Sequence, residues 1–136
     1  MTEACPCGRT GSFGAAGYEQ CCGRYLGPGS PQYLQAPDAE SLMRSRYTAY
    51  VSGHVDYLLA TWAPSHRPAS LDLDPGTAWL GLQVLAHEPD GDRAEVEFVA
   101  RFREPGPGAA RGPERQLHER SRFARLDGRW FYLDAR

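Results

Sequence analysis

The segment from Ala36 to Gly53 constrains the fold most, because its periodicity, its start and its end all predict one buried helix. Apolar residues recur at positions 39, 42, 43, 47, 50 and 51, the spacing of a helix that buries one face. Asp38 can accept the free amide hydrogens of the first turn, and Gly53 can adopt the left-handed conformation that ends a helix. We therefore expect a core helix between Asp38 and Gly53.

One charged residue falls on the buried face of this helix. At about 100° per residue, Arg46 lies in the middle of the apolar stripe. A buried charge is unfavourable unless it has a partner. The expected burial of Arg46 therefore indicates that it forms an internal ion pair or contacts a bound ligand.

A second helix and a sheet are expected after Gly53. Residues 54–62 have helical spacing of apolar residues and are followed by Pro64, and residues 70–73 alternate as in a short strand. Four longer strands follow, with Asp127-Gly128 as the hairpin turn between the last two. The four predicted strands are Trp79–His87, Arg93–Arg103, Arg115–Leu126 and Arg129–Asp134. The Gly/Pro-rich residues 104–108 are expected to form a loop without a site.

The two-residue period of the strands places a second charge inside. Ala94, Val96, Phe98, Ala100 and Phe102 share one face of their strand. Leu117 and Phe123 put Glu119 on the buried face of the next strand. Since Arg46 and Glu119 are both predicted to be buried, we expect them to meet within hydrogen-bonding distance between helix and sheet.

All four cysteines fall within the first 22 residues, as Cys5-Pro6-Cys7-Gly8 and Cys21-Cys22-Gly23. In a reducing cytoplasm this cluster indicates metal or redox chemistry rather than a disulfide scaffold. Four thiolates around one ion form a closed structural zinc site, so Cys5, Cys7, Cys21 and Cys22 are expected to bind zinc. A vicinal disulfide between Cys21 and Cys22 is the redox alternative, but it strains the peptide and leaves the other two cysteines unexplained.

The sequence predicts two parts. Residues 1–35 form a zinc knuckle and linker, and residues 36–136 form an α+β domain in which two helices pack on an antiparallel sheet. Tyr25, Leu26, Tyr33 and Leu34 could fasten the linker to the core. Because helices and sheet have a core of their own, the second part is expected to stay folded without the first.

Composition excludes some classes of protein. No run approaches the ~18 consecutive apolar residues of a membrane span, and the start lacks the features of a signal peptide, so we expect a cytoplasmic location. Residues 101–136 carry nine arginines against five acidic residues, although the net charge of the chain is −2. This basic third could attract a polyanion, but solvated strand faces are the simpler interpretation.

Parts of this chain resemble a known zinc-binding motif and a known protein family. Cys5-Pro6-Cys7-Gly8 followed by Tyr18-Glu19-Gln20-Cys21-Cys22 is similar to the SEC-C zinc motif of bacterial proteins. Together with residues 42–50, 56–62, 118–123 and 128–132, it resembles the YchJ-like family of uncharacterised bacterial proteins. The order of helices and strands resembles the nuclear transport factor 2-like (NTF2-like) cone, in which a curved sheet wraps a long helix and leaves a pocket.

The chain departs from the family pattern at two places. Thirteen residues separate Cys7 from Cys21, where the family has about eight; lengthening the loop costs only about 0.4 kcal/mol, so the site should persist. Ala63 stands where the family tends to have histidine. No catalytic role can therefore rest on that position.

Three functions follow from these patterns. The favoured one is a non-enzymatic adaptor whose knuckle contacts a protein or ribosomal partner, as the SEC-C resemblance implies. The alternative is a small-ligand-binding or enzymatic cone, of the isomerase or hydratase kind, with a pocket formed by Arg46, Tyr47, Tyr50, Trp62 and Glu119. Nucleic-acid binding through the C-terminal arginines ranks third, because the interleaved exposed aromatics of a single-strand platform are missing. No nucleophile–base pair is recognisable, so we assign no catalytic residue.

Overall fold

The computed structural model describes residues 3–11, 14–107 and 111–136, and its central element is helix α1, Ala39–Ser52. The side chain of Asp38 accepts a hydrogen bond from the backbone N–H of Ser41 at 2.7 Å, and Gly53 ends the helix with φ of 76°. Both features confirm the predicted boundaries. No helix in the described part of the chain is long and apolar enough to span a membrane.

Helix α2, Val55–Ala60, is shorter than predicted because the chain leaves it to join the sheet. The N–H of Tyr132 donates to the carbonyl of Thr61, and the N–H of Ala63 donates to the carbonyl of Tyr132, both at 2.8 Å. These bonds form a parallel bridge between Trp62 and Tyr132. The end of α2 is thereby fixed beside the last strand.

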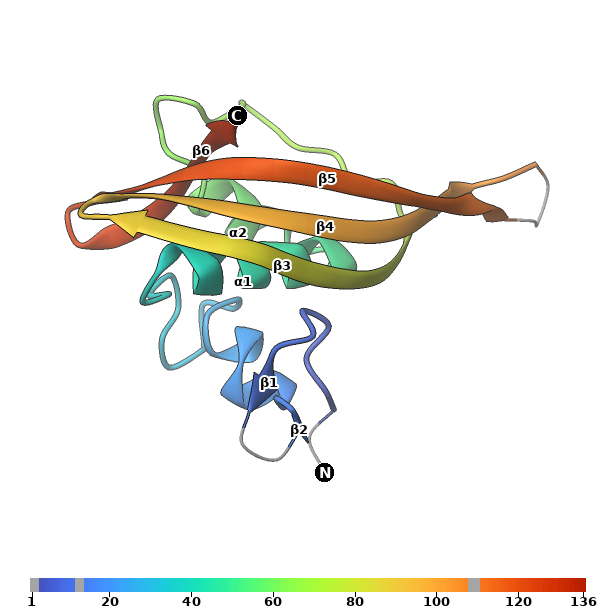
Figure 1. The fold of residues 1–136 in the computed structure, drawn as a ribbon, viewed down its shortest axis with the longest axis horizontal. Coiled ribbons are helices and arrows are strands. Elements are labelled where there is room, and N and C mark those ends of the chain that lie inside the picture. Colours follow the sequence, from blue (N-terminus) through green and yellow to red (C-terminus); the bar gives the residue numbers. More distant parts are fainter. Residues whose placement is uncertain (1–2, 12–13, 108–110) are drawn as a thin grey trace.

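Four antiparallel strands form one sheet in the order in which they occur along the chain. Asp127 and Gly128 have φ of 51° and 80°, as the predicted two-residue hairpin turn requires. The strands are β3, Ala78–Asp90; β4, Arg93–Pro105; β5, Arg111–Leu126; and β6, Arg129–Ala135. The two helices lie together against one face of this curved sheet (Figure 1).

Two details of the strand prediction were wrong. Residues 70–73 form no strand. β3, β4 and β5 all extend beyond their predicted ends. Asp90 of β3 still pairs with Arg93, and Pro105 of β4 still pairs with Arg111, which shortens the predicted loop. Residues 108–110 of that loop lie outside the described residues.

Strand β3 carries two irregularities along its length. Its register with β4 shifts between Trp79 and Gly81 and again between Val84 and Ala86. The residues skipped by the pairing are Leu80 and Leu85, and both side chains are exposed. These are β-bulges in a strand at the edge of the sheet.

The face assignment of β4 and β5 is confirmed. Val96 and Phe98 are buried against the helices, and they pair with Ser121 and Glu119 of β5. Glu119 therefore lies on the inner face, as the period of two predicted. The aromatic and aliphatic side chains of this face form the core together with α1.

The N-terminal segment packs on the side of α1 that faces away from the sheet (Figure 1). It contains strands β1, Thr10–Gly11, and β2, Gly14–Ala15, and the short 3₁₀ helices η1, Tyr18–Gln20, and η2, Cys22–Arg24. Because α1 lies between this segment and the sheet, nine of its fourteen residues are buried.

Residues after the cysteines also belong to the common core. Tyr25 and Leu26 are each only 2% exposed, in one cluster with Leu42 and Tyr57. The structure thus makes Tyr25 and Leu26 core residues rather than optional fasteners of a linker. An independent domain after residue 35 would lose part of its own core.

Candidate metal centre and adjoining pocket

Short-range hydrogen bonds and two glycines bring the four cysteines together. The N–H of Cys5 donates to the carbonyl of Ala16 at 2.9 Å, so the first cysteines lie beside the chain that returns toward Cys21. Gly8 has φ of 77°, which favours glycine directly after Cys7. At Gly23 an added Cβ would lie 2.7 Å from the carbonyl oxygen of Tyr18, so only glycine fits after Cys22.

The four thiols form one compact buried cluster. Their sulfur atoms all lie within 4.8 Å of one another, and the Sγ atoms of Cys7 and Cys21 are 3.6 Å apart. All four cysteines are free and buried. The arrangement could hold a metal ion, and the alternative, a vicinal disulfide between Cys21 and Cys22, is not formed.

The thiols influence one another's ionisation. Hydrogen bonds with Cys21 and Cys22 lower the pKa of the Cys7 thiol to about 7. The contact with Cys21, followed by those with Cys5 and Cys7, raises the pKa of the Cys22 thiol. Without a cation the cluster therefore ionises in part, because several negative sulfurs cannot share so small a volume.

Polar contacts tie this cluster to helix α1. The Sγ of Cys5 lies 3.8 Å from Oγ1 of Thr48, and Nη1 of Arg44 donates to the backbone carbonyl of Cys7 at 3.0 Å. Nε of Arg44 also donates to Glu40 at 2.8 Å. The cysteine cluster and the central helix are therefore joined through the side chain of Cys5 and the backbone of Cys7.

The opposite side of α1 borders a cavity of about 260 Å³. Its walls contain all five pocket residues that the sequence singled out, namely Arg46, Tyr47, Tyr50, Trp62 and Glu119. Sequence reasoning did not assign the other lining residues to a pocket: Met43, Trp79, Phe98, Ala100, Leu117, Ser121, Phe123 and Tyr132. Most of them were predicted to face inward, but no local pattern indicated that they surround a space.

Trp79 is the most informative residue among those missed. Its ring centroid lies 5.8 Å from the rings of both Tyr47 and Tyr50, and 5.4 Å from the ring of Phe102. Trp79 thus closes the aromatic wall between α1 and the sheet. Its place at the start of the predicted strand gave no signal for this role.

Arg46 is 5% exposed, and its contacts are with neutral groups. Nη1 donates to the carbonyl of Leu58 and to Oγ1 of Thr61, both at 2.7 Å. The guanidinium also lies over the rings of Trp62 and Tyr132, at 5.4 and 4.6 Å from their centroids. Burial lowers the pKa of Arg46, but a guanidinium stays protonated in proteins.

The predicted ion pair between Arg46 and Glu119 is absent. Within residues 3–11, 14–107 and 111–136, no ion pair within 4.0 Å joins these two side chains, although both line the cavity. Backbone carbonyl, hydroxyl and aromatic groups satisfy Arg46 instead. Burial raises the pKa of the Glu119 carboxyl, and no other cause contributes to this shift.

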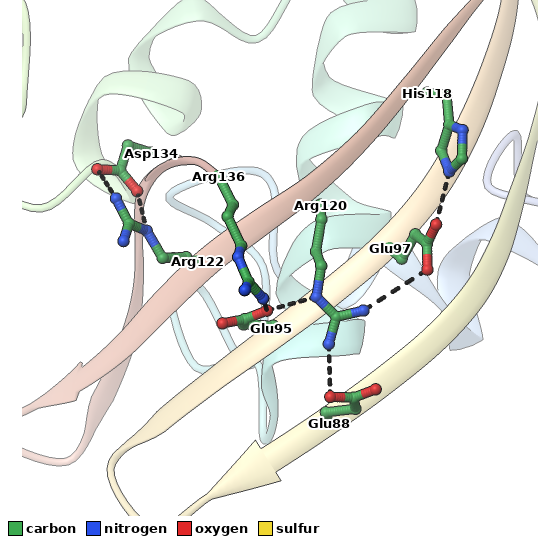
Figure 2. Close-up of polar contacts among 8 residues, drawn as sticks. All are labelled: Glu88, Glu95, Glu97, His118, Arg120, Arg122, Asp134 and Arg136. Atoms are coloured by element: carbon green, nitrogen blue, oxygen red, sulfur yellow. Dashed lines mark hydrogen bonds and ion pairs between the residues drawn. The ribbon is translucent and has the colours of Figure 1, made fainter.

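The outer face of the sheet carries charged side chains from all four of its strands and from the C-terminal Arg136 (Figure 2). Arg120 contacts Glu88, Glu95 and Glu97, and Nε of Arg122 donates to Asp134 at 2.6 Å. Carboxylates thus neutralise these arginines of the basic C-terminal third. The pattern agrees with the interpretation of solvated strand faces.

An antiparallel sheet wrapped on two helices, with a cavity between them, defines an NTF2-like domain, and the buried cysteine cluster adds a SEC-C-type knuckle. Residues 38–135 match the family described as YchJ, middle NTF2-like domain. The chain belongs to this YchJ-like family.

Relatives across bacteria resemble the chain over nearly its full length. A UPF0225 protein of Polaromonas sp. (strain JS666) is 57% identical over 134 residues, covering 96% of this chain and 90% of the relative. A UPF0225 protein of Streptomyces coelicolor is 48% identical over 133 residues, covering 98% and 94%. The similarity thus includes both the knuckle and the NTF2-like domain.

Two solved structures share the architecture. A SEC-C motif containing protein from Rhodopseudomonas palustris, solved in solution, superimposes with a TM-score of 0.79 at 36% identity, covering 98% of both chains. The crystal structure of a SEC-C motif containing protein from Psychrobacter arcticus gives a TM-score of 0.76 at 30% identity, covering 97% of this chain and 81% of the other.

Proposed function

We propose that this protein is a zinc-binding protein whose NTF2-like domain binds a small molecule in the cavity between α1 and the sheet. The observation that carries the proposal is the composition of the cavity walls. They are mainly aromatic, and they also contain a buried guanidinium and a partly buried carboxyl. Ligand sites in proteins typically combine an apolar cleft with a few placed polar groups.

Zinc fits the cysteine cluster by chemistry and by size. Four sulfurs placed tetrahedrally at about 2.3 Å from zinc lie about 3.8 Å apart, and the pair Cys7 and Cys21 is separated by 3.6 Å. A set of four thiolates leaves no open position for a reactive water, so the metal would be structural. The reducing cytoplasm predicted from the sequence would keep the thiols available.

Binding rather than catalysis suits the cavity as described. Ser121 and Glu119 both line it, but none of the hydrogen bonds found among the described residues joins this hydroxyl to this carboxyl. A nucleophile needs an adjacent base to become reactive. The proposal therefore assigns no reaction to the cavity.

NMR titration of the ¹⁵N-labelled protein tests the proposal. The probes are phenylacetate, phenylacetamide and phenethylamine, which share a phenyl group and differ in charge. At least one should shift the amide resonances of residues around the cavity, Tyr47 and Phe98 among them. The proposal is wrong if none of the three does so at millimolar concentration.

A matched pair of variants locates the binding. Leu117 and Leu126 lie on the same strand with similar exposure, 37% and 42%, and only Leu117 lines the cavity. Leu117→Trp should narrow the cavity and weaken binding, whereas Leu126→Trp should leave it unchanged. Equal binding by both variants would place the probe elsewhere.

The adaptor role through the knuckle remains a separate prediction, because it rests on the SEC-C resemblance. Glu19 is exposed on η1, so Glu19→Arg alters the knuckle surface without touching a cysteine. Affinity capture from bacterial lysate with wild-type protein and with this variant would test it. A partner retained equally by both would argue against recognition through this part of the knuckle.

A further inference from the structure

The charge of Arg46 has no anionic partner in the described structure. Its Nη1 donates hydrogen bonds to the carbonyl of Leu58 and the hydroxyl of Thr61, and both acceptors are neutral. Tyr132 lies against the guanidinium, but burial raises the pKa of its hydroxyl to about 12, so it is a neutral phenol at physiological pH. Arg46 is therefore a buried cation stabilised by dipoles and rings, with its charge uncompensated.

This cation faces a space rather than a packed wall. Arg46 lines the 260 Å³ cavity and is the only basic residue among the thirteen lining residues. Trp62, whose ring lies beside the guanidinium, lines the same cavity, and its buried Nε1 has no hydrogen-bond partner in the described part of the chain. An unpaired buried donor is unfavourable, so the cavity wall combines a cation that lacks a counter-charge with one donor that lacks an acceptor.

The remaining titratable groups do not supply the missing anion. The cavity walls contribute Tyr47 and Tyr50 from α1, Tyr132 from β6 and Glu119 from β5, whereas β3 and β4 contribute Trp79, Phe98 and Ala100, which do not titrate. Glu119 is the one carboxyl. It makes no ion pair with Arg46, and burial favours its neutral form.

We propose that the ligand of this cavity is a small organic carboxylate, with its carboxylate against Arg46 and its apolar body against the aromatic wall around Trp79. This assignment rests on the proposed ligand-binding function and adds the charge of the ligand. The cavity is at the small end of ligand pockets, which favours a single ring or a short chain as the apolar body. A protonated Glu119 donates a hydrogen bond to such an anion, whereas an ionised Glu119 repels it.

The order of affinities of the three probes tests the assignment. Phenylacetate should bind about tenfold more tightly than phenylacetamide, because a charge-assisted hydrogen bond replaces a neutral one. Phenethylamine should bind most weakly. Equal affinity of phenylacetate and phenylacetamide, or tighter binding of phenethylamine, would overturn the carboxylate assignment but would still support small-molecule binding. If no probe bound, both the carboxylate assignment and the proposed small-molecule binding would be wrong.

Two variants separate the charge effect from folding. Arg46→Met should remove the preference for phenylacetate over phenylacetamide, with the dispersion of the amide spectrum showing whether the fold persists. Glu119→Gln leaves the contacts of Arg46 in place and keeps a neutral donor at this position at every pH. Its affinity for phenylacetate should therefore stay constant with pH, whereas that of wild type should fall as Glu119 ionises. A variant whose affinity for phenylacetate falls with pH as steeply as that of wild type, or a wild type whose affinity for phenylacetamide falls equally, would contradict the proposed orientation.

Discussion

The Sγ of Cys5 lies 3.8 Å from Oγ1 of Thr48, so a candidate metal ligand touches the central helix directly. Arg44 adds a second link from the same helix to the carbonyl of Cys7. Metal binding and the stability of the helical layer are therefore expected to be coupled.

Native mass spectrometry of protein kept in reducing buffer should show one zinc per chain. Cys22→Ser should lose the metal, because it removes one of four ligands. Thr48→Val should keep it but release it to a chelator more readily, since loss of an outer hydrogen bond typically weakens metal affinity by about 10–100-fold. A disulfide-bonded protein that takes up no zinc after reduction and metal addition would disprove the site.

A chain that starts at residue 36 should be strongly destabilised, contrary to the expectation from sequence. The deletion exposes the surface that Tyr25 and Leu26 cover. In the full chain, Leu26→Ala should lower the free energy of unfolding by about 2–5 kcal/mol, whereas Leu85→Ala, at a residue 46% exposed, should have little effect. Urea unfolding measures both, and a wild-type midpoint for the truncated chain would refute this view of the core.

Arg46→Met should lower the free energy of unfolding by about 2 kcal/mol, because it leaves the carbonyl of Leu58 without its charged donor. Since no ion pair joins Arg46 to Glu119, adding Glu119→Leu should not rescue the loss. The effects of the two substitutions should add to within about 0.5 kcal/mol. A double mutant clearly more stable than Arg46→Met, beyond the effect of Glu119→Leu alone, would show that the charges are coupled after all.

The raised pKa of Glu119 predicts a pH dependence of stability. The carboxyl binds its proton more tightly in the folded state than in the unfolded state, so its contribution favours folding at low pH. That contribution is lost as pH rises from about 4.3, the ordinary glutamate value, through the raised pKa. Relative to Glu119→Gln, the wild type should thus become less stable across this window, as urea titrations at several pH values would show. A difference that is constant or grows in the opposite direction would contradict it.

The parts of the fold that are encoded locally were predictable. Asp38, Gly53 and the apolar spacing between them specify α1, and the Asp127-Gly128 turn specifies the last hairpin. The inward position of Glu119 followed from the two-residue period of its strand. The cysteine cluster was visible because the chain has no other cysteine.

The parts that depend on distant contacts were not predictable. A helical period predicts that Arg46 is buried. It cannot predict that the carbonyl of Leu58 and the hydroxyl of Thr61, at the end of α2, accept the hydrogen bonds of Arg46 in place of Glu119. The burial of Tyr25 and Leu26 arises because α1 is covered on two sides, and one apolar stripe does not reveal a second covered side. The cavity itself exists only once α1, the four strands of the sheet and the segment around Trp62 are assembled.

Two stretches of the sheet edge, at β6 and at β3, are poorly suited to pairing with another strand. The outer edge of β6 is occupied by the backbone around Trp62. The edge at β3 is open, but its bulges at Leu80 and Leu85 interrupt the regular row of amides and carbonyls that an incoming strand would need. At these two places an incoming strand would find no continuous template, which reduces the risk of aggregation by strand addition there.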